Sequence, residues 1–574
     1  DDILDGLLIK SENWQALNLI LNKYKGKVQT IYIDPPYNTG SDEFLYRDRY
    51  QHSSWLTMME NRLSLAKKLI REDGVIFISI GDTLRESIRI NSTSRLQMLC
   101  NHLFGEGNLI ATFVRKSGIA PRQDIKYVAN AHDYIICYSK EIDKAKINRK
   151  PANISRLKYK DSHFEERGYF DLNQLDRGSI QYSASLDYPI IIEKGTIIEI
   201  FDGKNFEKKP APERIEIWPG GNPLDKRWIF RWSKEKVEWG IANDFIVFRK
   251  INNRWKVFYK EYELVDNEGK PRERTNPYDT LILEYPNELG TREIEGLFDD
   301  RLFEYPKPTD LIKYLVNIGT GKESLILDFF AGSGTTAHAV MKLNKEDRGK
   351  RKFILVEMAD YFDTVIIPRI KKVAYSFNWK EGKPQDTDGI GVFFKYQILE
   401  QYEDTLDNIE LKENKQAQEL FKDEYLIKYF LDFETKESPY LLNIERLKNP
   451  FAYKLKVNLQ EVGEPEEAVV DIPETFNYLL GIKVKKIKVR KNERKYLFIL
   501  GEKEYKNIAI VWREYSDDWE EEDFKKDKEF IVKELENWKP HIVYINGQNV
   551  LTPQNWEVRY IEPEFKRLMD VTYV

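Results

Sequence analysis

The sequence predicts an α/β fold around a mostly parallel sheet that is covered on both faces. Short apolar runs that do not alternate with polar residues are typical of strands buried on both sides. Five such runs occur, at 28–33, 75–80, 134–138, 324–330 and 352–357. Helical patterns separate them; one spans 55–71, and we expect Asp73 and Gly74 to end it. A glycine-rich turn then leads from the fourth run into a helix that we expect to start near Thr335.

Length and composition exclude several classes of protein. The 574 residues are enough for three or four domains at about 150 residues each. A net charge of −5, from 90 basic and 95 acidic residues, excludes a uniformly basic nucleic-acid binder but leaves room for local basic patches. With only Cys100 and Cys137, the chain has neither a disulfide scaffold nor a Cys-rich zinc site, and its six histidines lack ligand spacing. We therefore expect no metal.

The ends and the hydrophobicity of the chain predict its location. No apolar run approaches the roughly 20 residues of a membrane span. The start at Asp1 does not resemble a signal peptide, so we expect a cytoplasmic protein with no membrane partner. Because the first residue is not Met, we also expect a processed or truncated start.

The glycine-rich loop after the fourth run predicts a nucleoside-type cofactor. Glycines let the backbone approach a ligand closely, and the helix that follows offers unpaired N–H groups. Glu357, at the end of the next strand, stands where an acidic residue would accept ribose hydroxyls. A dinucleotide motif is excluded because Ala337 replaces its third glycine, and a phosphate loop fails because Glu323 follows Lys322. The alternative is a tight strand–helix turn. The residues assigned to the cofactor are Asp328, Phe330, Ala331, Gly332, Ser333, Gly334, Thr335 and Glu357.

A second loop, Asp34-Pro35-Pro36-Tyr37, follows the first strand and suits chemistry on an exocyclic amine. Such an amine is a poor nucleophile because its lone pair is conjugated with the base ring. A carboxylate and a backbone carbonyl held by the two prolines can accept its two N–H groups and free the lone pair. Tyr37 can stack on the base, worth about 1–3 kcal/mol, which helps to offset extruding the base from a duplex. The alternative is a turn with a partly buried tyrosine.

Together the two loops resemble the motifs of DNA amino-methyltransferases, which use S-adenosylmethionine. The catalytic loop comes first, a long insertion follows, and the cofactor loop 330–334 comes last, as in the beta group of that family. The resemblance implies a Rossmann-like sheet of seven strands with one reversed, base flipping, and transfer to adenine N6 in preference to cytosine N4. It adds Lys307 and Pro308 to the cofactor pocket. It also assigns a cofactor contact to Asp82, although Gly81 stands where a second acidic residue is expected.

A finer resemblance is to the modification subunits of type III restriction–modification systems. It is carried by DPPYNTG at 34–40, SENWQALNLI at 11–20 and the segment 562–569. It implies double-stranded DNA as substrate, a homodimer, and a helicase–nuclease restriction subunit as partner. We assign Asn38 and Thr39 to contact with the DNA.

The domain organisation follows from shifts in composition. We expect a catalytic half of the methyltransferase domain, a target-recognition domain, a cofactor half, and a C-terminal α+β domain for dimerisation and partner docking. Their expected limits are 1–140, 141–300, 301–397 and 398–574, with a linker at 378–390, a charged helical stretch at 398–433 and strand-like runs at 482–489, 496–500 and 508–512.

Three charged segments lie outside the two loops. Residues 226–260 hold ten basic and three acidic residues among nine aromatics, which favours DNA contact through Arg227, Arg231 and Lys234; the alternative is an aromatic core beneath solvated charges. Residues 483–490 alternate charged and apolar side chains, which predicts a half-buried edge strand. Residues 517–523 are expected to form a solvated loop.

The leading interpretation is an adenine-N6 DNA methyltransferase acting as a type III modification subunit. The alternatives are a stand-alone or cytosine-N4 methyltransferase, or a DNA-specificity scaffold for a helicase–nuclease. An RNA methyltransferase fits less well, because the long insertion suits the reading of a duplex.

Overall fold

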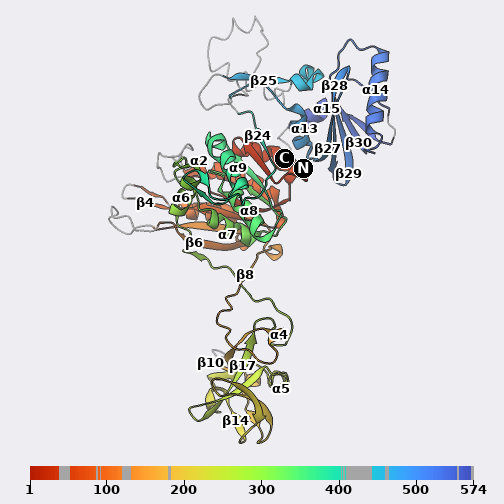
Figure 1. The fold of residues 1–574 in the computed structure, drawn as a ribbon. Coiled ribbons are helices and arrows are strands. Elements are labelled where there is room, and N and C mark those ends of the chain that lie inside the picture. Colours follow the sequence, from red (N-terminus) through yellow and green to blue (C-terminus); the bar gives the residue numbers. More distant parts are fainter. Residues whose placement is uncertain are drawn as a thin grey trace. The chain divides into compact units, whose positions relative to one another are not determined.

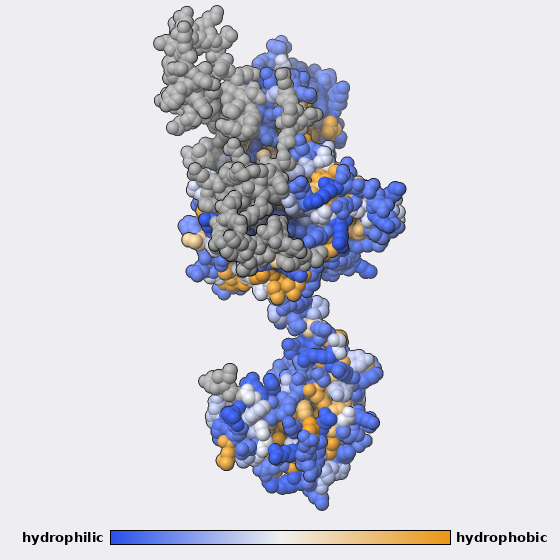
Figure 2. Space-filling view, turned by 90° about the vertical axis from the view of Figure 1, so that its left-hand side faces the viewer, coloured by the Kyte–Doolittle hydropathy of each residue, from blue (hydrophilic) through white to orange (hydrophobic). Residues whose placement is uncertain are grey.

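The computed structural model divides the chain into two compact units (Figure 1). Unit 1 consists of Asp1–Asn148 and Asp279–Val574, and unit 2 of Arg149–Tyr278. The structure describes residues 1–37, 52–85, 88–90, 92–118, 131–178, 182–401, 404, 408, 443–458, 465–552 and 555–569. The surface seen in Figure 2 is largely hydrophilic, in keeping with a chain in which 32% of residues are charged. In the described part of the chain, no helix combines the length and apolar character that a membrane crossing needs.

A nine-stranded sheet forms the centre of unit 1, in the order β19-β6-β7-β3-β2-β20-β21-β1-β24. Strand β7 is antiparallel to both neighbours, and the other pairs are parallel, which confirms the single reversed strand. The expected sheet had seven strands; the structure adds β19 and β24 at the edges. The strands are β1 (Gly6–Lys10), β2 (Val28–Ile33), β3 (Ile70–Ile80), β6 (Leu109–Lys116), β7 (His132–Ser139), β19 (Leu281–Ile282), β20 (Leu325–Asp328), β21 (Lys352–Glu357) and β24 (Phe394–Ile398).

Helices cover both faces of this sheet, because its central strands are apolar on both sides. Ile31 and Ile33 of β2 belong to a core shared with α1 (Asn13–Tyr24), α2 (His52–Leu69) and α3 (Ser92–Phe104). Thr30 points the other way, as alternate strand residues do, and its hydroxyl donates to the Gly319 carbonyl of α7 (2.8 Å). The helices packed together on that side are α7 (Thr309–Gly319), α8 (Thr335–Asp347) and α9 (Ile367–Tyr375).

The predicted helix at 55–71 ends earlier than expected. Helix α2 stops at Leu69, and β3 begins at Ile70, so Asp73 and Gly74 lie inside a strand. The register between β2 and β3 shifts at this point. A Cβ on Gly74 would lie 2.7 Å from the Gln29 carbonyl oxygen. The glycine therefore permits the close approach of two strands and does not terminate a helix there.

The central parallel strands bring both predicted loops to one edge of the sheet. Strands β3, β2, β20 and β21 are consecutive neighbours, so their carboxyl ends lie side by side. Asp34 follows β2, Asp328 ends β20 and Glu357 ends β21. Ligands of open α/β sheets bind at this edge.

Unit 2 contains a five-stranded sheet in the order β13-β12-β16-β17-β9. Its core includes Phe170, Trp232 and Phe248, and Trp239 and Trp255 pack against it. The aromatics of 226–260 are thus largely core residues, as the alternative interpretation had it. The elements are β9 (Phe170–Gln174), β12 (Ile197–Phe201), β13 (Phe206–Pro210), β16 (Ile246–Ile251), β17 (Arg254–Tyr262) and α5 (Lys234–Ala242). Near the two ends of unit 2, β8 (Lys150–Pro151) pairs with β18 (Thr275–Asn276).

The C-terminal part of unit 1 has its own sheet, in the order β27-β28-β29-β30-β31. Strand β27 lies at the edge of this sheet, as predicted for 483–490. The expected half-burial is wrong, because Val484 is buried but Ile487 and Val489 are 55% and 57% exposed. The strands are β27 (Lys483–Asn492), β28 (Arg494–Lys503), β29 (Lys506–Arg513), β30 (Ile542–Ile545) and β31 (Glu557–Tyr560). Helices α13 (Ile472–Leu480), α14 (Glu521–Leu535) and α15 (Ile561–Met569) accompany them, and α13 packs on α1.

Several domain and element boundaries in the structure differ from those expected from the sequence. Residues 279–300 carry β19 and α6 (Asn287–Phe298) and belong to unit 1, not to the insertion. The expected linker at 378–390 contains a hairpin, β22 (Trp379–Lys380) with β23 (Lys383–Pro384), and the Gly382 amide donates to the Gly296 carbonyl of α6 (3.0 Å). Residues 521–523 begin α14, because Glu520 and Asp523 form a capping box. Most of the helical stretch expected at 398–433 lies outside the described residues.

Candidate active site

Asp34 stands at the carboxyl end of β2 with its two oxygens in different environments. Oδ2 accepts a charged hydrogen bond from Lys307 Nζ at 2.5 Å. Oδ1 is buried and has no hydrogen-bond partner among the described residues. A buried acceptor without a donor costs free energy. The loop therefore holds one carboxylate oxygen ready for a donor that the described part of the chain does not supply.

The Pro-Pro turn after Asp34 is held from two helices. Trp55 of α2 donates its indole N–H to the Pro36 carbonyl (2.9 Å), and Ser92 of α3 donates its hydroxyl to the Tyr37 carbonyl (2.7 Å). Because Trp55 engages the carbonyl of Pro36, the Pro35 carbonyl is the better candidate for the second amine hydrogen. The sequence did not reveal Trp55, which reads as one more apolar position of a helix.

The ring of Tyr37 is packed between Gly81, which follows β3, and Lys307. A Cβ on Gly81 would lie 3.0 Å from two ring carbons of Tyr37, so only glycine leaves the ring in this place. This close approach gives a physical reason for glycine where the family resemblance led us to expect an acidic residue. Lys307 Nζ lies 5.2 Å from the ring centroid. Burial, and then the charge of Asp34, raise the pKa of Tyr37 well above its ordinary value, so its buried hydroxyl, which has no hydrogen-bond partner among the described residues, is neutral.

Asp328 organises the glycine-rich loop from inside. Its Oδ1 accepts the Phe330 amide (3.1 Å) and its Oδ2 accepts the Thr336 hydroxyl (2.5 Å). Gly332 and Gly334 have φ of +53° and +76°, conformations that favour glycine. Burial raises the pKa of Asp328 to about 7. The residue fixes the shape of the loop through these two contacts, whereas its direct contact with a cofactor stays a prediction.

Glu357 reaches the same loop from the neighbouring strand. Its Oε2 accepts the Gly332 amide (2.9 Å), and its Oε1 accepts the amides of Met358 (2.9 Å) and Ala359 (3.2 Å). The side chain is 2% exposed. Contact between Glu357 and ribose hydroxyls stays a prediction, and the structure shows that its carboxylate is fixed in one orientation beside Gly332.

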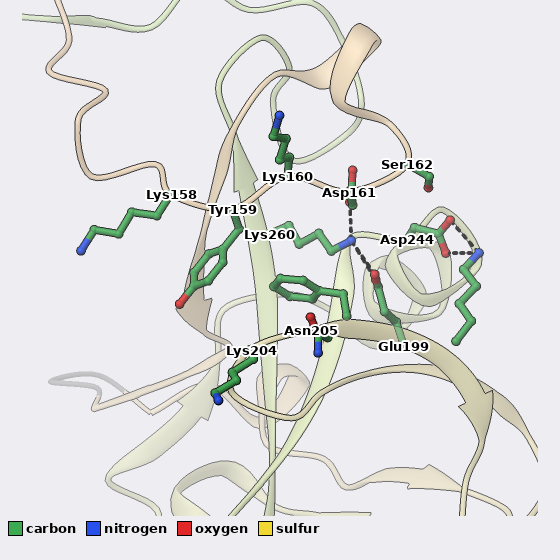
Figure 3. A pocket seen from close by; sticks show the side chains of 12 residues that line it. Lys158, Tyr159, Lys160, Asp161, Ser162, Glu199, Lys204, Asn205, Asp244 and Lys260 are labelled. Atoms are coloured by element: carbon green, nitrogen blue, oxygen red, sulfur yellow. Dashed lines mark hydrogen bonds and ion pairs between the residues drawn. The ribbon is translucent and has the colours of Figure 1, made fainter.

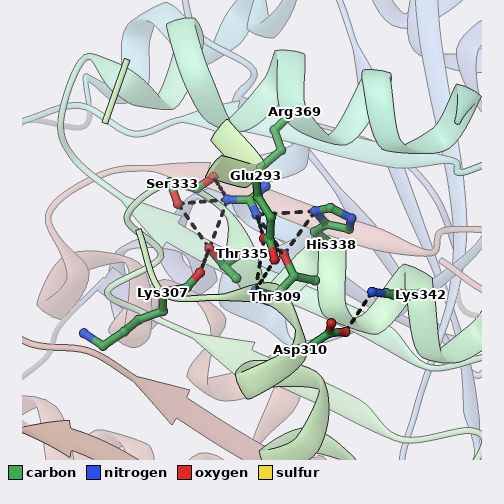
Figure 4. Close-up of polar contacts among 9 residues, drawn as sticks. All are labelled: Glu293, Lys307, Thr309, Asp310, Ser333, Thr335, His338, Lys342 and Arg369. Carbon is green, nitrogen blue, oxygen red and sulfur yellow. Dashed lines mark hydrogen bonds and ion pairs between the residues drawn. The ribbon is translucent and has the colours of Figure 1, made fainter. Parts of the chain in front are cut away.

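A buried polar cluster around Arg369 of α9 lies beneath the loop, and nothing in the sequence indicated it (Figure 4). Arg369 is fully buried and donates to the Ser333 carbonyl (3.1 Å), to the Thr335 hydroxyl (3.0 Å) and to the Thr309 hydroxyl (3.0 Å). Glu293 of α6 lies 3.5 Å from the guanidinium. Burial lowers the pKa of Arg369 to about 10, so it stays charged near neutral pH. Four segments distant in sequence thus meet on one cation.

The same cluster positions Lys307 and Pro308, two predicted cofactor residues. The Thr335 hydroxyl donates to the Lys307 carbonyl (3.3 Å), and Pro308 precedes the first residue of α7. A Cβ on Gly290 of α6 would lie 2.1 Å from the Pro306 carbonyl oxygen, so glycine is needed for this approach. Lys307 is thereby held with its ammonium on Asp34, which links the catalytic loop to the cofactor loop.

The remaining predicted residues are not gathered here. Asn38 and Thr39 lie outside the described residues. Asp82 Oδ1 accepts the Thr93 amide (2.9 Å) in the first turn of α3, a helix contact that gives no support to its expected cofactor role. In unit 2, Arg227 is paired with Asp225 (2.8 Å), and Arg231 and Lys234 are exposed. Within the described residues, no group of three or more His, Cys, Asp or Glu could hold a metal ion.

The site combines an aspartate–proline–proline–tyrosine turn and a glycine-rich turn at adjoining strand ends of an α/β sheet. A model of the DNA methylase family matches residues 28–367. The chain belongs to this family, and the resemblance that the two loops predicted is confirmed.

Individual relatives make the likeness finer. The chain is 31% identical over 409 residues to the Type III restriction-modification enzyme EcoPI Mod subunit of Escherichia phage P1, covering 65% of this chain and 60% of that one. It is 29% identical over 450 residues to the StyLTI Mod subunit of Salmonella typhimurium, covering 70% and 62%. It is 30% identical over 344 residues to the Type II methyltransferase M.KpnI of Klebsiella pneumoniae, covering 58% and 75%. The chain thus spans less than two thirds of the length of these two Mod subunits.

Proposed function

We propose that the chain transfers a methyl group from S-adenosylmethionine to the N6 amino group of adenine in double-stranded DNA. The observation that carries the proposal is the Asp34 carboxylate, which lies beside the ring of Tyr37 and has one buried oxygen to which no described residue donates. An exocyclic amine supplies the missing N–H. The family of the chain and its methyltransferase relatives support the same reaction.

The residues of the chain fit the cofactor. The open turn at Gly332, the carboxylate of Glu357 beside it and the ring of Phe303 would hold the nucleoside part; a Cβ on Gly332 would lie 3.4 Å from Phe303. When bound, S-adenosylmethionine supplies an electrophilic methyl group on a positively charged sulfur. Phe303 begins the segment 303–308, which the family resemblance places at the cofactor pocket, although only Lys307 and Pro308 of that segment were assigned as site residues.

The protein's part in the transfer is to make the amine a nucleophile. Asp34 Oδ1 accepts one N–H of the amine while Lys307 holds Oδ2, so the carboxylate keeps one orientation. As the new bond forms, the nitrogen gains positive charge, and the carboxylate stabilises it and lies in place to take its proton. Removing one such preorganised group typically costs about 100- to 1,000-fold in rate. Tyr37 offers its ring to the extruded base.

The biological setting belongs to the same proposal. The Mod relatives favour a modification subunit that works with a restriction subunit, and the insertion between the two loops favours unit 2 as the reader of the DNA sequence. We further propose a homodimer formed partly through the C-terminal part of unit 1, and a cytoplasmic location. Light scattering on the purified chain tests the dimer.

The deciding experiment uses the full chain, labelled methyl donor and duplex DNA, with no other protein. We expect label in the DNA, and sequencing of the modified bases to report adenine N6. Bound but unlabelled DNA would favour the specificity scaffold, and N4-methylcytosine would favour the cytosine alternative. Asp34→Asn is the matched control, because it keeps the side-chain shape and removes the charge.

A further inference from the structure

Unit 2 contains a cavity of about 480 Å³ that no part of the proposed reaction uses (Figure 3). Its floor is Lys260, which is fully buried between Asp161 (2.5 Å) and Glu199 (2.8 Å). Aromatic rings of Tyr159 and Phe206 stand beside it. The remaining charged lining residues are Lys158, Lys160, Lys204, Lys208 and Asp244.

The rim of the cavity is suited to an anion. Lys158, Lys160 and Lys204 are exposed and form no ion pair with a carboxylate among the described residues, whereas Lys208 is paired with Asp244 (2.7 Å). In Figure 3 the three side chains extend away from the floor in different directions. Lys160 also lies over the Phe164 ring, 4.8 Å from its centroid. Exposed lysines without a paired carboxylate suit a phosphate chain, because each contact releases counterions from the nucleic acid.

The interior is suited to a base. Tyr159 and Phe206 form an edge-to-face pair with centroids 5.4 Å apart, and Phe206 stacks on Phe201 at 4.5 Å, so the rings are held rigidly. Aromatic faces stack on any base.

Asp161 is already satisfied, because its Oδ2 accepts from Lys260 and Tyr262 and its Oδ1 accepts the His163 amide. Glu199, held by Lys260, has a buried Oε2 without a hydrogen-bond partner among the described residues and offers this acceptor to the N–H edge of a base. A metal ion is a poor occupant, because the Lys260 ammonium already sits between these carboxylates.

We propose that this pocket binds one unpaired nucleotide of a DNA strand, with its phosphates on the rim lysines and its base against Tyr159 and Phe206. The inference rests on the proposed function in that unit 2 meets DNA. It adds a second nucleotide site, distinct in its residues from the Asp34 loop. Unit 2 would then read DNA partly through a base that leaves the duplex.

The test measures binding by the full chain to two short duplexes, one fully paired and one with a single unpaired thymine. Thymine has an N3–H donor for the Glu199 carboxylate and no exocyclic amine for Asp34. We expect tighter binding of the second duplex, by roughly tenfold, because the cost of extruding a base is already met. Replacing Lys158, Lys160 and Lys204 by Ala should weaken binding to both duplexes. The slope of the salt dependence should fall by about 0.9 for each phosphate that the variant no longer neutralises.

A matched control removes the same charge elsewhere in unit 2. Lys194, Lys209 and Lys270 are exposed and do not line the cavity, and their triple Ala variant should retain a salt dependence close to that of the unaltered chain. Phe206→Ala should abolish the preference for the unpaired thymine; its unfolding temperature shows whether unit 2 remains folded, and the lysine variants decide the case if it does not.

Two results would overturn the proposal: equal affinities for the two duplexes in the unaltered chain, or identical behaviour of the two lysine triples. Methyl transfer is a separate readout. A chain that shows the pocket effects but transfers no methyl group refutes the proposed function alone, and a chain that transfers methyl groups without them refutes the pocket alone.

Discussion

Asp34 and Asp328 stand at the carboxyl ends of the neighbouring parallel strands β2 and β20, yet their surroundings differ. Asp328 is 2% exposed, and both its oxygens accept hydrogen bonds from the loop that it shapes. Asp34 has one oxygen on Lys307 and one without a partner among the described residues. The same residue type at the same edge is a structural support in one loop and, by our proposal, a reactive group in the other. The completeness of the hydrogen bonding distinguishes them.

The largest expected effect is on the chemistry of Asp34. Asp34→Ala should lower methyl transfer by about 100- to 1,000-fold, because a preorganised group is removed where charge develops. The unfolding temperature should fall less than in Asp328→Ala, because the change removes one ion pair to Lys307 and no described residue donates to Oδ1. Initial rates at saturating DNA and donor check the prediction. Methylation within tenfold of the unaltered chain would contradict the assigned role.

Asp328→Ala should act on stability first. The change leaves the Phe330 amide and the Thr336 hydroxyl without their acceptor in a buried place. We expect the free energy of unfolding to fall by about 2–4 kcal/mol. Denaturant titration measures it, with Asp34→Ala as the control. Equal stability of the two variants would remove the distinction drawn between the two aspartates.

The distinction can be sharpened through pH. Burial raises the pKa of Asp328 from 3.8 to about 7, so folding favours its protonated form. Its contribution to stability is therefore present in full below about pH 4 and is lost as the pH rises through 7. Between pH 4 and pH 7, the free energy of unfolding of the unaltered chain should fall by at most about 4 kcal/mol relative to that of Asp328→Asn. The unfolding temperatures of both proteins are measured from pH 4 to pH 7. A difference between them that does not change with pH would contradict the raised pKa of Asp328.

The smallest effect is expected at Tyr37. Its hydroxyl has no partner among the described residues, so Tyr37→Phe should leave methyl transfer within about threefold, because no hydrogen bond is removed. Tyr37→Ala removes the ring and should weaken capture of the base by about 1–3 kcal/mol. The Michaelis constant for DNA reports the difference. A large decrease in the Phe variant would mean that the hydroxyl itself acts on the substrate.

The sequence predicted the central strands well because burial on both faces leaves a plain apolar signature. The runs 28–33 and 352–357 coincide with β2 and β21. Strand β1 was not predicted, because GLLIK is a short run and its place between β21 and β24 is decided by pairing with distant residues.

The candidate site was predictable only where loops carry unusual residues. Asp34–Tyr37 and 330–334 were found because prolines and glycines mark them. Arg369 and Trp55 were missed, since an arginine or tryptophan in an amphipathic helix has many ordinary explanations. Their roles depend on which segments the fold brings into contact, and hydrophobic periodicity carries no such information.

The paired strands β8 and β18 have a consequence for the history of the molecule. Pro151 pairs with Thr275, and Lys150 with Asn276, so the chain leaves unit 1 and returns to it side by side. The two ends of the insert are therefore close together, as the ends of a short turn are, whatever the length of the insert. The entropy cost of closing such a loop grows only slowly with its length. If unit 2 reads the DNA, as we propose, exchange of the whole insert by recombination at this junction would give a new binding specificity in one step and leave the strands of unit 1 unchanged.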